Sequence, residues 1–109
     1  MTFDEFMAQR IPAKSPGDLV ELREDLIARC HLVRERGWGS FIAAWSTGYV
    51  VVVAYLLRDT HVMDDLGEDA ESVCARWAFD LFGFVGGEAD RPNGWGRTAA
   101  WLAETQAAI

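Results

Sequence analysis

The hydrophobic residues are concentrated in one uncharged stretch, residues 37–57, with segments of helical periodicity on both sides. This stretch contains no Asp, Glu, Lys or Arg, whereas Arg36 precedes it and Arg58 follows it. A segment that is apolar on every side needs cover from other helices, from a sheet partner or from lipid. We therefore expect the other segments of the chain to cover or flank this stretch.

The segment before the uncharged stretch has the clearest helical pattern. Apolar residues recur there at steps of three and four, namely Leu19, Leu22, Leu26, Ile27, Cys30 and Val33. Ser15 is a typical N-cap, Pro16 fits the first helical position, and Gly37 is typical of a helix end. These signals predict an amphipathic helix over residues 16–36.

Three further helices are predicted from the same kinds of signal. Thr2 and Glu5 form a capping-box pattern that begins a short helix over residues 3–9. Apolar residues at helical spacing predict a helix over residues 68–83, which the glycines at 83, 86 and 87 are expected to end. The last helix is predicted over residues 96–107. Residues 58–68 are expected to form a polar loop, with residues 60–63 as a short extended piece.

The uncharged stretch has three interpretations. Ser40 could cap a buried helix at about 40–57; alternatively, residues 41–57 form a β-hairpin, as their β-branched and aromatic residues favour. Twenty-one uncharged residues are also long enough for a single membrane span at 37–57, although glycines and polar residues lower their hydropathy. The segment Gly37–Trp45 resembles Gly94–Trp101, which runs into a helix-forming sequence, and this similarity favours the helix.

The sequence therefore predicts one globular domain over residues 1–109. Its expected fold is mainly α, a compact bundle of four to five helices around an apolar central helix at about 40–57. The alternative is an α+β fold with the β-hairpin at 41–57. A chain of 109 residues is large enough for one hydrophobic core and too small for two.

The charge is negative and unevenly distributed. The net charge is −7, and residues 58–109 contain ten acidic and four basic side chains. An acidic half argues against direct nucleic-acid binding and is compatible with a partner protein that has a basic surface. The two cysteines cannot form a disulfide framework, and the first ten residues lack the pattern of a secretory signal. We therefore expect a cytoplasmic protein.

Two features suggest a surface that binds another protein. Five carboxylates lie within eight residues, namely Asp64, Asp65, Glu68, Asp69 and Glu71. Trp38 and Trp95 each lie between two glycines, and we predict them to be exposed or half-exposed anchors. The alternative is that the acidic residues only favour a helix N-terminus and that both tryptophans cover helix ends.

A second class of function would depend on His61. Together with Asp64 or Asp65, this side chain could form half of an acid–base or metal site in a small enzyme or cofactor-binding domain. No third ligand has suitable spacing, so the sequence predicts no metal, no cofactor and no catalytic residues.

The favoured hypothesis is a small, acidic, non-enzymatic protein-binding domain that inhibits or neutralises a partner. This profile resembles, in type only, the small acidic proteins of phages and mobile elements. Examples of that type are inhibitors of host defence systems, such as anti-CRISPR proteins, and immunity proteins. A homo-oligomer is compatible with this hypothesis, because a second subunit can cover apolar surface that one chain leaves exposed.

Overall fold

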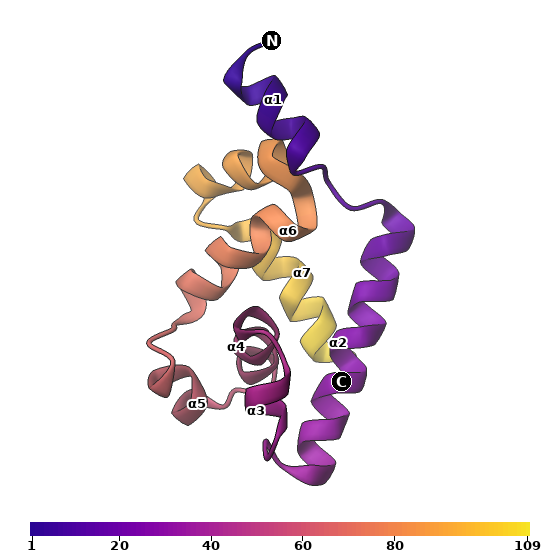
Figure 1. Ribbon diagram of the computed structural model, residues 1–109, viewed down its shortest axis with the longest axis vertical. Helices are drawn as coiled ribbons and strands as arrows, with labels where there is room; N and C mark the ends of the chain where they lie inside the picture. Colours follow the sequence, from indigo (N-terminus) through magenta and orange to yellow (C-terminus); the bar gives the residue numbers. More distant parts are fainter.

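A computed structural model describes residues 1–109 and contains helices but no strands. The elements in chain order are α1 (Phe3–Arg10), α2 (Pro16–Arg36), α3 (Phe41–Ala44), α4 (Thr47–Leu56), α5 (Thr60–Asp65), α6 (Ala70–Asp90), the 3₁₀ turn η1 (Arg91–Asn93) and α7 (Gly96–Ala107). The molecule is elongated, with extents of 48 × 29 × 25 Å, and α1 forms one end (Figure 1). The prediction of a mainly α bundle is confirmed, and the β-hairpin at 41–57 is wrong.

Helix α4 is the centre of the core. Residues 50–54 and Leu56 are buried, so the helix is covered on nearly every side. Helices α2, α5, α6 and α7 all pack against it (Figure 1). The four successive valines at positions 50–53 are therefore accommodated in a helix because other helices surround it. The prediction of an apolar helix at the centre of the bundle is confirmed for residues 47–56, whereas residues 42–44 of the predicted helix are exposed at the surface.

The central stretch nevertheless contains two helices rather than one. Helix α3 ends at Ala44, and Trp45 adopts an extended conformation with ψ 153°. Ser46 is also extended and is the N-cap of α4. The break falls at Trp45 and Ser46, directly before Thr47 and Gly48, because Ser favours a cap position and Gly has a low helix propensity. None of the helices has the length and apolar content needed to cross a lipid bilayer.

Residues 58–68 contain helix α5, so the predicted loop and the extended piece at 60–63 are wrong. The Asp59 carboxylate accepts a hydrogen bond from the Val62 N–H (3.2 Å) and caps this helix. Val62 and Met63 are buried and anchor it to the core. Because α5 forms and α3 is separate from α4, the bundle has seven α-helices instead of four to five.

Helix α6 continues through the glycines that were expected to end it. Gly83 has φ 75° and ψ −178°, and this conformation kinks the helix. The segment Ile11–Lys14, here called the 11–14 strap, crosses the kink. The Phe84 N–H donates to the Ile11 carbonyl (2.9 Å), and the Lys14 N–H donates to the Leu81 carbonyl (3.2 Å). The strap thus replaces helical hydrogen bonds that the kink removes, and α6 extends to Asp90.

Two predicted helices have the observed boundaries. Helix α2 spans Pro16–Arg36, and the Ser15 hydroxyl accepts from the Asp18 N–H (3.1 Å) as the cap pattern predicted. Helix α7 spans Gly96–Ala107 and packs against both α2 and α6. These two helices and α6 enclose α4.

Candidate functional site

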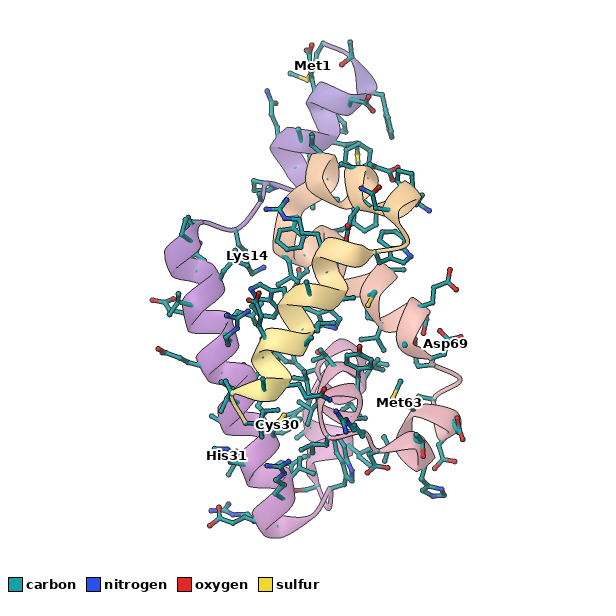
Figure 2. The ribbon with its side chains drawn as sticks, turned by 180° about the vertical axis from the view of Figure 1, so that it is seen from behind. Met1, Lys14, Cys30, His31, Met63 and Asp69 are labelled. Carbon is teal, nitrogen blue, oxygen red and sulfur yellow. The ribbon has the colours of Figure 1, made fainter.

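The five predicted acidic residues lie between the last turn of α5 and the first turn of α6. Figure 2 labels Asp69, the residue directly before α6. Asp64 and Asp65 are exposed at the end of α5, and Glu71 is exposed in the first turn of α6. Glu68 and Asp69 lie between them. The five carboxylates thus follow one another along this part of the chain, and their role in binding a partner stays a prediction.

Two of the five carboxylates have structural partners. The Asp69 carboxylate accepts from the Ser72 N–H (2.8 Å), and the Ser72 hydroxyl accepts from the Asp69 N–H (2.9 Å), which forms a capping box for α6. Glu68 is only 11% exposed and binds both the Ser72 hydroxyl and the Arg76 guanidinium. The hydrogen bond from Ser72 is the main cause that lowers the pKa of Glu68, and Arg76 lowers it further. Asp64, Asp65 and Glu71 are therefore the carboxylates available to a partner.

An open groove of about 530 Å³, here called the acidic groove, lies beside these carboxylates. Asp64, Glu68 and Asp69 line one part of it, and Tyr55 and Met63 provide apolar surface. The groove also contains one positive charge, Arg58, whose guanidinium donates to the Gln106 side chain. This combination suits a long basic side chain, because its aliphatic stem needs apolar contact and its charged head needs carboxylates.

The His61 side chain does not form a site with the acidic residues. It is 86% exposed, and its Nε2 lies 3.5 Å from the carboxylate of Asp65, one helical turn away. His61 is not among the residues that line the acidic groove. No group of three or more His, Cys, Asp or Glu side chains is arranged to hold a metal ion. The hypothesis of a small enzyme gains no support from this geometry.

The two predicted tryptophan anchors differ in exposure. Trp38 is half-buried, and its indole N–H donates to the Asp59 carboxylate (2.8 Å). Trp95 is only 7% exposed, so the expectation of an exposed side chain is wrong. Its ring packs edge-on against Phe79, and the Arg91 guanidinium lies over it at 5.4 Å. The left-handed conformation of Trp95, with φ 62°, accompanies this inward placement.

Replacing Trp38 by Phe tests the link between this indole and Asp59. The hydrogen bond from Trp38 is the main cause that lowers the pKa of Asp59, and the backbone N–H of Val62 contributes next. In Trp38→Phe we expect this pKa to rise toward its usual value and the protein to lose about 1 kcal/mol of stability. An NMR titration of the Asp59 carboxyl measures the shift. Trp45→Phe is the control, and an unchanged Asp59 pKa in Trp38→Phe would contradict the link.

An aromatic cluster that the sequence pattern does not predict lies at the surface between α2 and α4. The rings of Phe41 and Trp45 stack with centroids 4.8 Å apart. The Arg29 guanidinium lies 4.8 Å from the Trp45 ring centre and 4.0 Å from that of Tyr49. Asp25 holds Arg29 in place through an ion pair of 2.8 Å. Only the Asp25–Arg29 spacing could have been recognised in the sequence, because the aromatic contacts depend on the break between α3 and α4.

Comparisons of the chain with family models, with curated proteins and with solved structures give no match. The charges and grooves of the surface are therefore the features that indicate a function. The most distinctive combination is the acidic groove and the three neighbouring carboxylates that have no structural partner of opposite fixed charge, Asp64, Asp65 and Glu71.

Proposed function

We propose that the protein is a non-enzymatic binding domain that inhibits or neutralises a partner protein by covering a basic surface. The observation that carries this proposal is the position of Asp64, Asp65 and Glu71 at the surface, with Asp64 also lining the acidic groove. A basic surface that otherwise binds nucleic acid is a suitable target, because carboxylates can take the places of phosphates. The cytoplasm is the expected compartment for such a target.

The groove supports a specific mode of contact. An Arg side chain of the partner would lay its stem against Tyr55 and Met63 and direct its guanidinium to the carboxylate of Asp64. The exposed carboxylates around it would mainly accelerate association and make binding sensitive to salt. Phage and mobile-element inhibitors of host defence systems, including anti-CRISPR proteins, and immunity proteins are the types of protein that this mode fits.

Replacing Asp64, Asp65 and Glu71 together by Ser tests the proposal. Glu68 and Asp69 are kept because they hold Arg76 and cap α6. We expect a partner captured by the tagged protein at low salt to bind the triple variant roughly 10–100-fold more weakly, since each exposed ion pair contributes up to about 1 kcal/mol. Calorimetry with the purified partner measures this loss, and high salt should reproduce it in the unchanged protein.

A control variant distinguishes the effect of the acidic residues at this site from the effect of the protein's net charge. Replacing Glu21, Glu24 and Glu35 on α2 by Ser removes the same charge from exposed positions elsewhere. This variant should bind the partner with unchanged affinity. If both variants bind equally weakly, the effect comes from the overall charge of the protein. If the Asp64, Asp65 and Glu71 variant binds with unchanged affinity, these residues are not part of the interface.

A further inference from the structure

The indole N–H of Trp77 on α6 is a buried donor without a hydrogen-bond partner. Trp77 is 4% exposed and lies in the core beside α4. An unpaired buried donor is unfavourable, and in folded proteins such groups nearly always have an acceptor. This donor therefore points to an acceptor that comes from outside the chain.

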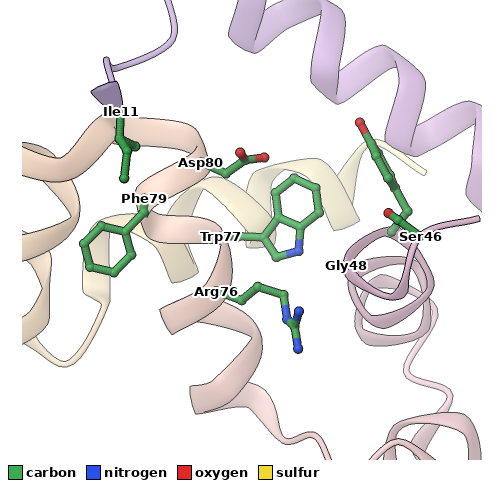
Figure 3. Close-up of a pocket in the computed structure, with 8 residues that line it drawn as sticks. Ile11, Ser46, Gly48, Arg76, Trp77, Phe79 and Asp80 are labelled. Atoms are coloured by element: carbon green, nitrogen blue, oxygen red, sulfur yellow. The ribbon is translucent and has the colours of Figure 1, made fainter. Parts of the chain in front are cut away.

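Trp77 lines an open groove of about 470 Å³ between the start of α4 and the middle of α6, here called the Trp77 groove (Figure 3). Ile11, Tyr49 and Phe79 give it apolar and aromatic walls. In Figure 3 the nitrogen-bearing edge of Trp77 faces Gly48, in the first turn of α4. The unpaired N–H is thus directed to the α4 end of the groove.

The start of α4 supplies a second, independent set of donors to the same place. The Ser46 side chain makes no capping hydrogen bond. The backbone N–H groups of Thr47, Gly48 and Tyr49 have no acceptor in the chain. Helix α4 has ten residues, and its N-terminus carries a partial positive charge. Because Ser46 and Gly48 line the Trp77 groove, donors of two different origins meet there without an acceptor.

The charged side chains of the groove place the missing acceptor at the α4 end. The Asp80 carboxylate also lines the groove and lies 3.7 Å from the Lys14 ammonium. Arg76 lines the groove as well, and its guanidinium is bound to Glu68. An anionic oxygen would therefore be repelled near Asp80 and attracted at Trp77 and the start of α4. Aromatic walls beside it favour a ligand with a planar apolar body.

We propose that the Trp77 groove binds a small carboxylic acid with an aromatic body. One carboxylate oxygen accepts from Trp77 Nε1–H and from the free N–H groups at the start of α4, and the other accepts from the Ser46 hydroxyl. The ring lies against Tyr49 of α4. Because Nε1 is shielded from solvent, a neighbouring side chain of the groove moves aside when the ligand enters. This site is separate from the acidic groove, so it stands or fails independently of the proposed function.

Titration of the protein with benzoate, followed in ¹H–¹⁵N spectra, tests the proposal. The chain has five tryptophans, and the variant Trp77→Phe identifies the Trp77 indole signal. We expect a saturable downfield shift of that signal, whereas the Trp38 indole, already bonded to Asp59, stays in place. Acetate, which lacks the ring, should bind at least tenfold more weakly. A stationary Trp77 signal, or equal affinity for acetate and benzoate, would overturn the proposal.

Two matched variants test the donors at the start of α4. Ser46→Ala should weaken benzoate binding several-fold, and Ser40→Ala, the same change at the start of α3, should leave it unchanged. Benzoate should also raise the Tm of the unchanged protein and not that of Trp77→Phe. If Trp77→Phe does not fold, the titration of the two serine variants decides the matter. Equal benzoate affinity of both serine variants would contradict the site.

Discussion

Replacing Gly83 by Ala is expected to lower the free energy of unfolding by roughly 3–5 kcal/mol. Gly83 has φ 75° and ψ −178°, a conformation that is almost restricted to glycine. A Cβ at this position would lie 2.5 Å from the Ala13 nitrogen and 2.8 Å from the Ile11 carbonyl oxygen. Both contacts are with backbone atoms, so the strap itself must move.

Movement of the 11–14 strap would remove the hydrogen bonds that compensate for the kink in α6. The Lys14 ammonium also donates to the Asp80 carbonyl (2.8 Å), so the strap makes three hydrogen bonds across the kink. Their loss adds to the backbone strain, and helix α1 would lose its attachment to the end of α6. A loss of 3–5 kcal/mol is a large part of the roughly 5–15 kcal/mol typical of a domain.

Urea unfolding followed by circular dichroism measures this effect. Gly17→Ala is the matched control, because Gly17 lies in the first turn of α2 and its added Cβ would be 3.9 Å from the Ser15 hydroxyl oxygen. That variant should be as stable as the unchanged protein or more stable by up to about 1 kcal/mol. Equal free energies of unfolding for Gly83→Ala and Gly17→Ala would contradict both the backbone strain expected at position 83 and the displacement of the strap.

The sequence predicted a helix boundary correctly where the capping groups come from residues next to that boundary. Ser15 and Pro16 predicted the start of α2, because an N-cap acts within its own turn. Gly83 was misinterpreted because the groups that let α6 continue beyond it come from Ile11 and Lys14, about seventy residues away. Hydrogen bonds of that range leave no pattern near the glycine itself.

The same limit applies to the candidate sites. The acidic residues were recognised from composition, and the pairing of Glu68 with Arg76 was not, because it depends on side-chain conformations after folding. The burial of Trp95 follows from its contacts with Phe79 and Arg91. The unpaired N–H of Trp77 depends on how α4 packs against α6, which no local pattern in the sequence records.

Asp90 is expected to be the most important single carboxylate for stability. It is buried, and its carboxylate accepts from the N–H groups of Arg97 (2.9 Å) and Thr98 (3.0 Å) and from the Thr98 hydroxyl (2.7 Å). It therefore caps α7, whose N-cap residue Trp95 makes no side-chain cap. Asp90→Ala leaves these donors unpaired, and we expect a loss of about 2–4 kcal/mol at pH 7.

The pH dependence of that loss distinguishes a charged cap from simple packing. Burial alone would raise the pKa of Asp90, but the hydrogen bonds from Thr98 and Arg97 outweigh it, and the pKa is lowered. A lowered pKa means that the stabilisation is complete above the unfolded-state value, about 4, and is lost as the pH falls through the folded-state value.

Urea unfolding between pH 7 and pH 2.5 should therefore show the difference between the unchanged protein and Asp90→Ala decreasing below about pH 4. Asp80→Ala is the control on the same helix, because Asp80 forms an exposed ion pair with Lys14 and should contribute less than about 1 kcal/mol. A difference between the unchanged protein and Asp90→Ala that stays constant over this pH range would mean that the side chain acts by its volume, and its charge would then have no part in holding α7 against α6.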